Sequence, residues 1–317
     1  MPALKDIEYK EINGIKVDKE NDEAFFNDET HTYYNKETMQ KYVSVTTLIH
    51  DYSQEFDENF WSSYKALESI LSETEWMGLR SQLLSTKRIP KNLFSLVTLD
   101  KDVFEAKKNE ILKEYAIKRK TATDRGTLIH SQFENSFYGN KNIDFKKFGC
   151  GELKGDFQCK KDYYKLDLKQ GVYPEFFISL ISRDGLLRVA GQVDLLIVDQ
   201  SDIYICDFKT NKEIKKTSFY NKNKKSNEMM KFPLNNLQDC NFNHYQLQLS
   251  TYAYMLKQIN PEYNIKKLLL YHIDHDGNET IIPCEYLKDD VERMLKHYKK
   301  QSKIHEELER IKPVQIC

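Results

Sequence analysis

Two aspartates and a lysine are the residues of this sequence whose types and spacing could do chemistry. Asp194 lies in one apolar segment, and Asp207 and Lys209 end the next one. The two segments, 188–198 and 203–209, are rich in Val, Ile and Leu and are separated by four polar residues, which is typical of a β-hairpin. Carboxylates and an ammonium group among apolar side chains cost stability unless another charge compensates them. A hard divalent cation is the usual counterpart of paired carboxylates, so the pattern indicates a metal site.

The register of this hairpin decides whether the two carboxylates meet. If Gln200 and Ser201 form a two-residue turn, Asp194 lies directly opposite Asp207. Directly paired residues share one face of a sheet, with Cβ atoms about 5 Å apart. Side chains alternate along a strand, so Lys209 joins the same face. An isolated Asp-x-Lys triplet is more often a solvated strand face, but here both acids belong to apolar strands.

A further acid, Glu175, lies in the preceding apolar segment 172–181, which leads into an Asp-Gly pair at 184–185. Asp-Gly between apolar segments is a strong hairpin signal. Counting back from that turn places Glu175 near residues 192–194, where it would be a third carboxylate of the metal site. A slip of one residue would turn the side chain to the opposite face.

Four short motifs follow one another along the chain. Their positions are Gly126 to His130, Gly191 to Asp194, Asp207 to Lys209, and Gln248 to Tyr252. In residue type and order they resemble the catalytic core of PD-(D/E)xK nucleases, in particular the RecB-like and mitochondrial genome maintenance exonuclease branch. The resemblance implies an α/β (α+β) fold with a central mixed sheet flanked by helices.

The resemblance also implies a metal-ligand set. Asp194, Asp207, His130 and the backbone carbonyl of Phe208 would bind one or two Mg²⁺ or Mn²⁺ ions, and neutral imidazole suits Mn²⁺ better than Mg²⁺. An isolated helical histidine is more often structural, so the likeness to the Gly-x-x-x-His motif is what makes His130 a candidate. Glu134 lies one helical turn after His130. It would either orient the imidazole without binding the metal itself, or be a solvated acid on the helix surface.

Three more residues take catalytic roles by resemblance. Lys209 would orient or deprotonate the attacking water, or offset charge on the pentacovalent phosphorane. Gln248 and Tyr252, one helical turn apart, would position the scissile phosphate and orient that lysine. From the residues alone, Gln248 and Tyr252 would belong to an ordinary amphipathic helix with the tyrosine in the core.

A lysine-rich stretch after the Asp-x-Lys motif is the candidate nucleic-acid-binding surface. Lysine runs are usually solvated loops, but beside a nuclease motif they would contact phosphates, and aromatic rings among them would stack on unpaired bases. The candidate residues are Lys212, Lys215, Lys216, Tyr220, Lys222, Lys224 and Lys225.

The chain is predicted to divide near residue 120. Residues 1–120 would form an amino-terminal hairpin, at 30–46, and a helical lobe, and residues 121–317 would form the nuclease core. The lysine-rich loop occupies about 211–243 of that core. Other expected elements are a helix over 101–138, a helix from 243, strands at 267–273 and 280–286, and a terminal helix over 289–311.

Composition excludes some classes of protein. The chain has 317 residues, 40% of them hydrophobic, which is enough for a sizeable core, and its net charge of −1 gives no overall attraction to a polyanion. No signal-peptide pattern or 18-residue apolar stretch occurs, so we expect a soluble, cytoplasmic protein without membrane contact. Some RecB-like nucleases hold an iron–sulfur cluster, but no cysteine precedes Cys150 and no Cys-x-x-Cys pair occurs, so none is expected here.

These features predict a metal-dependent DNA exonuclease of phage or bacterial type that acts in replication, recombination or repair. DNA with a free end is the expected substrate, single strands are favoured over duplex, and a 5′-phosphate is the expected product end. Because the chain has no P-loop motif, a helicase or annealing partner would be a separate protein. The alternatives are a structure-specific endonuclease on the same fold and a catalytically silent nucleic-acid-binding or scaffold protein.

Overall fold

The computed structural model describes residues 10–138, 144–148, 150, 153, 159, 168–221 and 225–311. They fall into two compact units. The first, called the sheet unit, comprises Met1–Ser53, Ile129–Phe219 and Asn227–Cys317, and the second, called the helical unit, comprises Gln54–Leu128 and Tyr220–Ser226. These units do not coincide with a division at residue 120, because the amino-terminal strands pair into the sheet of the first unit.

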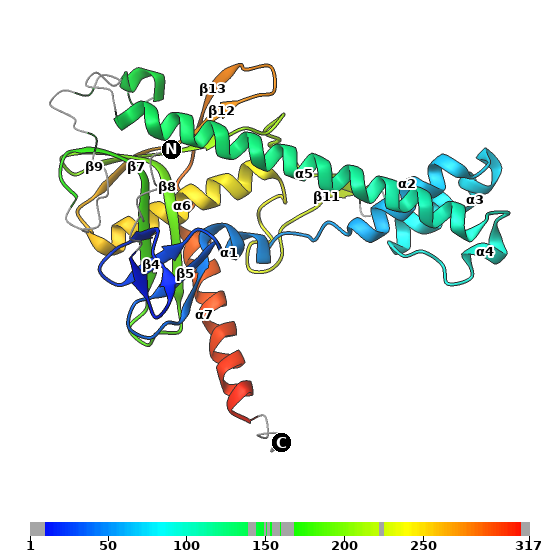
Figure 1. Cartoon of the computed structure of the whole chain (residues 1–317), viewed down its shortest axis with the longest axis horizontal. Coiled ribbons are helices and arrows are strands. Elements are labelled where there is room, and N and C mark those ends of the chain that lie inside the picture. The colour runs from blue at the N-terminus through cyan, green and yellow to red at the C-terminus, as the bar shows by residue number, and fades with distance from the viewer. Residues whose placement is uncertain are drawn as a thin grey trace, which may run out of the picture. The chain divides into compact units, whose positions relative to one another are not determined.

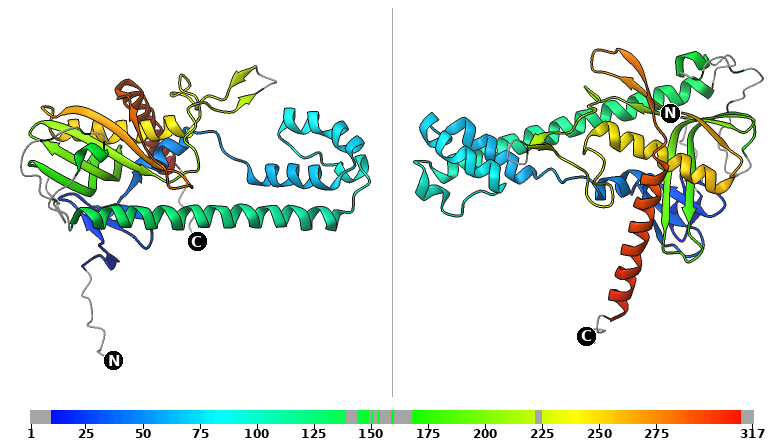
Figure 2. Two further views of the ribbon diagram at one scale, coloured as in Figure 1. Left: turned by 90° about the horizontal axis from the view of Figure 1, so that it is seen from above. Right: turned by 180° about the vertical axis from the view of Figure 1, so that it is seen from behind.

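A mixed β-sheet is the frame of the sheet unit (Figure 1). Its strands are β3 Lys19–Glu20, β4 Ala24–Asn27, β5 Thr32–Asn35, β6 Lys41–Ser44, β7 Gly171–Ile181, β8 Arg188–Asp199, β9 Asp202–Lys209, β12 Asn264–Ile273 and β13 Glu279–Cys284. Within the described residues they pair in the order β13-β12-β9-β8-β6-β5-β4-β3, with β7 also paired to β8. Strands β7, β8 and β9 are antiparallel neighbours, whereas β12 is parallel to β9 and β6 is parallel to β8. Figure 2 shows the twist of this sheet from two further sides.

The central strands read as almost continuous apolar segments because both faces of the sheet are covered. In β8, Leu196 and Val198 pack into one hydrophobic cluster, and Leu195 and Ile197 pack into another on the opposite face. Successive side chains of β8 therefore point alternately into two hydrophobic cores, one on each face of the sheet, and neither face is open to solvent here. The mixed sheet with helices on its faces confirms the predicted fold class.

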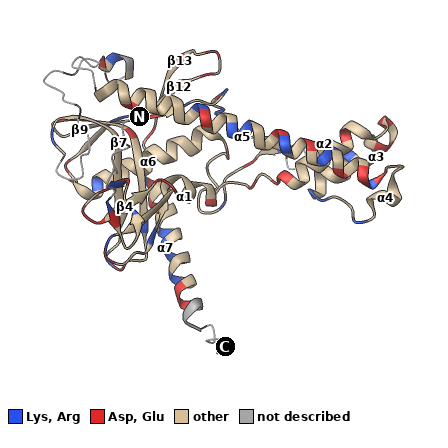
Figure 3. Cartoon of the chain, viewed as in Figure 1, with Lys and Arg blue, Asp and Glu red and all other residues tan. Residues whose placement is uncertain are grey.

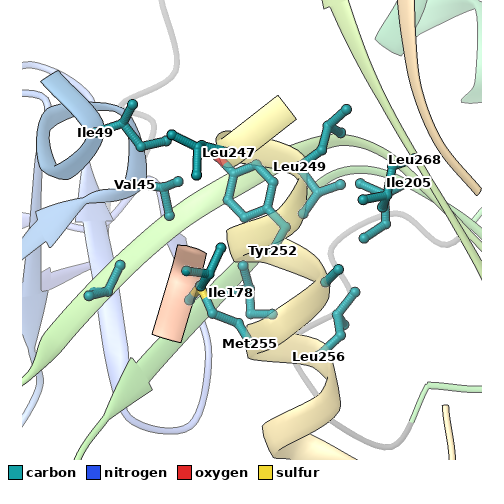
Figure 4. Close-up of a cluster of buried hydrophobic side chains, with 14 of the residues drawn as sticks. Val45, Ile49, Ile178, Ile205, Leu247, Leu249, Tyr252, Met255, Leu256 and Leu268 are labelled. Atoms are coloured by element: carbon teal, nitrogen blue, oxygen red, sulfur yellow. The ribbon is translucent and has the colours of Figure 1, made fainter. Parts of the chain in front are cut away.

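Among the described residues, three whole helices and the end of a fourth, α5 Lys101–Tyr138 from Ile129 onward, belong to the sheet unit. Helix α1, Val45–Asp51, begins at Ser44, whose side chain accepts a hydrogen bond from the Thr47 backbone N–H at 3.0 Å. This N-cap marks the point where β6 ends and the helix begins. Helix α6, Asn241–Ile259, lies against the sheet with its apolar side chains in the core (Figure 4). Helix α7, Lys288–Ile311, packs on α6.

The helical unit has its own core. It contains α2 Glu58–Ile70, α3 Glu73–Thr86, α4 Leu93–Leu96 and the first part of α5 Lys101–Tyr138. Phe60, Leu67, Trp76 and Leu83 are buried together in it. Ser72 and Glu75 form a capping box that starts α3.

Several short elements lie outside the sheet of the first unit. They are β1 Glu11–Ile12, β2 Ile15–Lys16, β10 Tyr220–Asn221, β11 Ser226–Asn227 and a 3₁₀ turn at Phe145–Phe148. Among the described residues, no helix combines the length and the apolar character needed to span a lipid bilayer.

Candidate active site

The β8–β9 hairpin has the register expected from its turn. Asp199 pairs with Asp202, and Leu195 pairs with Cys206. Asp194 and Asp207 adjoin this last pair on the two strands, and the Phe208 backbone N–H donates a 2.7 Å hydrogen bond to Asp194 Oδ2. Asp194 is 8% exposed and Asp207 is 1% exposed, so both acids are buried where the two strands meet.

An imidazole and two carboxylates converge beside this hairpin. His130, Glu175 and Asp194 each offer one ligand atom, and these three atoms all lie within 4.8 Å of one another. His130 Nδ1 is 3.6 Å from Asp194 Oδ2 and 3.9 Å from Glu175 Oε1. One nitrogen and two carboxylate oxygens are a donor set that fits a hard or borderline divalent cation such as Mg²⁺ or Mn²⁺.

The second nitrogen of the imidazole fixes its orientation. His130 Nε2 lies 3.1 Å from the backbone carbonyl oxygen of Phe208. With the proton on Nε2 donated to that carbonyl, the lone pair of Nδ1 faces the carboxylates, as ligand histidines are usually held. The Phe208 carbonyl, predicted as a metal ligand, is thus the hydrogen-bond acceptor of His130.

Glu175 reaches the site through a local break in β7. Pro174 pairs with Leu195 and Phe176 pairs with Val193, but Glu175 itself makes no ladder pair in this register. Its φ of 48° lies in the left-handed region, which costs a non-glycine residue roughly 1–3 kcal/mol and is concentrated at functional sites. With this backbone conformation the Glu175 carboxylate lies 3.9 Å from His130 Nδ1.

The site attracts positive charge in the absence of a metal. Burial alone lowers the pKa of His130, but the carboxylates of Asp194, Glu175 and Asp207 raise it to about 9. Burial, together with the charge of Asp207, raises the pKa of Asp194 to about 8. Burial opposes ionisation of Glu175, but its hydrogen bond with His130 and the charge of Lys19 hold its pKa below the usual value. A bound cation would take the place of the extra protons.

Asp207 belongs to a second group of contacts, with Lys209 and Gln248. Lys209 Nζ lies 2.5 Å from Asp207 Oδ2, and Gln248 Nε2 donates to Asp207 Oδ1 at 2.9 Å. Lys209 Nζ also donates to Gln248 Oε1 at 3.3 Å. Asp207 Oδ2 is buried, and among the described residues its close contact is this ion pair with Lys209. Burial alone lowers the pKa of Lys209, but Asp207 and Asp194 raise it above its usual value.

Tyr252 lies in the core, where its side chain interacts by a hydrogen bond with that of Gln248. It is 3% exposed and is surrounded by apolar side chains of α6 and the sheet (Figure 4). Its ring packs on the backbone of Gly191, where an added Cβ would lie 2.8 Å from Tyr252 Cε1. Gly191 therefore permits the close approach of α6 to β8, and this contact sets the position of Gln248 one turn earlier.

Sequence reasoning missed two residues of the site. Lys19 of β3 places Nζ 2.6 Å from Gln192 Oε1 and 3.5 Å from Glu175 Oε2. No local signal marks this lysine, because only the pairing of the amino-terminal strands brings it here. Tyr245 could have been predicted from the sequence, because it lies three residues before Gln248 and therefore on the same face of the helix. Lys209 Nζ is 4.6 Å from the centre of the Tyr245 ring.

The remaining predicted site residues lie elsewhere. Glu134 accepts a 2.9 Å hydrogen bond from the Tyr138 hydroxyl, one turn later on α5. This hydrogen bond is made within the helix. In the lysine-rich stretch, Lys212 and Lys215 are exposed, and Lys216 Nζ lies 5.2 Å from the centre of the Phe242 ring. Tyr220 and Lys225 are exposed residues of the helical unit, and the predicted contacts Lys222 and Lys224 lie outside the described residues, as does much of the 140–170 connection.

Fold and site together define a class of protein. It is an α/β protein in which a β-hairpin carries two acids and a lysine, while a helix adds a histidine. A family model described as the PD-(D/E)XK nuclease superfamily matches residues 35–316. Because the match spans most of the chain, this protein belongs to the PD-(D/E)XK nuclease superfamily, and the resemblance drawn from the four motifs is confirmed at that level.

Solved structures give weaker likenesses. SSO0001 is 15% identical, with a TM-score of 0.32 over 63% of this chain and 67% of that one. A candidate exonuclease from Eubacterium rectale is 11% identical, with a TM-score of 0.32 over 83% of this chain and 79% of that one. No curated protein matches the chain significantly.

Proposed function

We propose that this protein is a metal-dependent deoxyribonuclease that hydrolyses phosphodiester bonds from free DNA ends, during replication, recombination or repair. One observation carries the hydrolytic part: the ligand atoms of His130, Glu175 and Asp194 gather within 4.8 Å of one another, beside the Asp207–Lys209 pair. Superfamily membership supports nuclease chemistry. The choice of exonuclease rests on the resemblance of the His130 and Gln248–Tyr252 motifs to the RecB-like branch.

In this proposal His130, Glu175 and Asp194 hold a Mg²⁺ or Mn²⁺ ion, and Asp207 adds a further carboxylate. When bound, such an ion polarises the phosphate, lowers the pKa of a bound water and stabilises the leaving oxyanion. His130 is kept in its ligand orientation by the Phe208 carbonyl, 3.1 Å from Nε2. The left-handed backbone at Glu175 holds that carboxylate towards the imidazole.

Lys209 acts as a cation in this mechanism. Its pKa is raised by Asp207 and Asp194, so its ammonium keeps its proton and donates hydrogen bonds rather than accepting the proton of water. It would orient the attacking water and offset negative charge that develops on the phosphate. Gln248 bridges Asp207 and Lys209 and so fixes the direction of the ammonium.

The substrate proposal extends to strandedness and partners. Single-stranded DNA is the favoured substrate, and a helicase or annealing protein would supply it where the template is duplex. The exposed Lys212 and Lys215, which follow Lys209 in the sheet unit, would contact its phosphates.

The test uses end-labelled linear single-stranded DNA, linear duplex and circular single-stranded DNA, each with Mg²⁺, with Mn²⁺ and with chelator. Asp207→Asn is the test variant and Asp202→Asn, at the other end of β9, is the matched control. We expect metal-dependent loss of linear DNA only, by the wild type and the control. Cleavage of circles would replace the proposal with an endonuclease, and binding without hydrolysis would replace it with a silent nucleic-acid-binding protein.

A further inference from the structure

A groove of about 760 Å³ lies in the sheet unit between the segment 232–236 and helix α7. None of its lining residues belongs to the candidate active site. Arg293, Lys296, His297 and Lys300 line one wall. Their spacing of three and four residues places them on one face of α7.

The groove wall is basic and exposed to solvent. The side chain of Lys296 is 78% exposed and that of Arg293 is 46% exposed. Acids of the same helix face both: Lys296 Nζ is 3.6 Å from Glu292 Oε2, and the Arg293 guanidinium binds Asp290. Lys300 is also exposed. Figure 3 shows both basic and acidic positions on α7.

An aromatic ring is held out of the core at the opposite wall. Phe232 is 69% exposed, although its neighbours Met230 and Leu234 are 2% and 0% exposed. The Phe232 ring meets the His297 ring edge-on, with 5.4 Å between the ring centres. The two buried neighbours anchor the segment, so the exposure of the ring is fixed by the fold.

Hydrogen bonds tie this segment to its surroundings. The Lys231 N–H donates to the Tyr52 carbonyl oxygen at 2.7 Å. Arg293 donates to Asn236 Oδ1 at 2.8 Å, and Asn236 donates to Asp290 at 2.9 Å. The two walls are therefore joined, and the groove is formed without a ligand.

We propose that this groove binds an unpaired nucleotide of a nucleic-acid strand, with its base on the Phe232 ring and the neighbouring phosphates on Lys296 and Lys300. An exposed aromatic beside a row of cations is the combination that single strands require, because every base has a face that can stack and every phosphate carries a charge. A duplex hides its base faces, so it lacks the stacking contact. This inference rests on the proposed function for the identity of the ligand as nucleic acid.

The test is the fluorescence anisotropy of a labelled 20-nucleotide oligothymidylate, measured in chelator at several salt concentrations. Phe232→Ala should weaken binding about tenfold. The double variant Lys296→Ala/Lys300→Ala should reduce the slope of log affinity against log salt by about 1.4, which corresponds to two phosphate contacts on a single strand. Lys266→Ala/Lys288→Ala removes two exposed lysines that do not line the groove and is the matched control, and circular dichroism verifies folding of each variant.

Unchanged binding in the Phe232 and Lys296/Lys300 variants would overturn the proposal, as would an equal loss in the control. Equal competition by duplex DNA would overturn the stacking contact, and stronger competition by polyglutamate would assign the groove to an acidic protein segment. Because binding is measured without metal, it is independent of catalysis. A wild type that binds the oligonucleotide through this groove but hydrolyses no DNA with Mn²⁺ would refute the proposed function and leave the groove proposal standing.

Discussion

Two residues of the candidate metal site bind protons more tightly in the folded chain than in the unfolded chain. The pKa of His130 rises from 6.5 to about 9, and that of Asp194 rises from 3.8 to about 8. A group whose pKa is raised on folding stabilises the protein below its unfolded pKa, and this contribution is lost as the pH rises through the folded value. The stabilising contributions of His130 and Asp194 are therefore lost as the pH rises through about 8 and 9.

In chelator, we expect the free energy of unfolding to decrease by roughly 5 kcal/mol between about pH 6 and pH 9. Urea denaturation at the two pH values measures it. Asp194→Asn should flatten this dependence, because the amide does not titrate, whereas Asp199→Asn at the far end of β8 should not. A metal-free protein that is equally stable at both pH values would contradict the electrostatic account of the site.

Lys19 would compete with a metal ion for the Glu175 carboxylate. Its Nζ is 3.5 Å from Glu175 Oε2, so a cation bound by Glu175 has a positive charge next to it. Lys19→Met should therefore strengthen Mn²⁺ binding several-fold, measured by isothermal titration calorimetry. Lys36→Met is the control, because Lys36 pairs with Glu20 on the same amino-terminal strands and does not touch the site. Weaker Mn²⁺ binding in Lys19→Met would show that the lysine supports the ligand instead of competing for it.

At the scale of elements, the contact between α6 and β8 positions Gln248. Gly191→Ala would place a Cβ 2.8 Å from the Tyr252 ring and push α6 away from β8. Overpacking of this kind costs about 1–3 kcal/mol, and we expect DNA hydrolysis to fall at least tenfold as Gln248 moves from Asp207. Urea denaturation and a nuclease assay check the two effects.

The control for this change is Gly78→Ala on α3, where no atom lies within 4 Å of the added Cβ. A helical Gly→Ala substitution there should be neutral or stabilising by about 1 kcal/mol. If Gly191→Ala were as harmless as Gly78→Ala, the close packing of Tyr252 on β8 would not be what sets the position of α6.

The elements that could be predicted from sequence are those with strong local signals. The Asp184-Gly185 turn and the polar turn after Asp199 fix the β7–β8–β9 register, whose last β8–β9 pair, Leu195 and Cys206, adjoins Asp194 and Asp207. Counting back from the Asp184-Gly185 turn places Glu175 near Asp194, but the left-handed backbone at Glu175 could not be predicted, because no glycine or other local signal marks it. Lys19 could not be predicted either, because it enters the site through strand pairing between residues far apart in sequence.

At the scale of the whole molecule, two units with separate cores predict two unfolding steps. Both tryptophans of the chain, Trp61 and Trp76, belong to the helical unit, so tryptophan fluorescence reports on that unit alone. The candidate metal ligands belong to the sheet unit. Mn²⁺ at about 100 times its dissociation constant should stabilise the unit that binds it by about 2.7 kcal/mol.

We therefore expect Mn²⁺ to shift the urea transition of β-sheet circular dichroism and to leave the tryptophan transition in place. Chelator supplies the baseline for both signals, and Asp194→Asn should abolish the shift. A single transition, moved equally in both signals, would show that the two units unfold together.

The central claim is that a metal held by His130, Glu175 and Asp194 supports hydrolysis of DNA. The most direct measurement is the rate of hydrolysis of end-labelled linear single-stranded DNA across a Mn²⁺ titration, for the wild type, Asp194→Asn and Asp199→Asn. We predict metal-dependent hydrolysis by the wild type and by Asp199→Asn, and a loss of at least a hundredfold in Asp194→Asn. Hydrolysis that persists in chelator, or that Asp194→Asn retains in full, would contradict the claim.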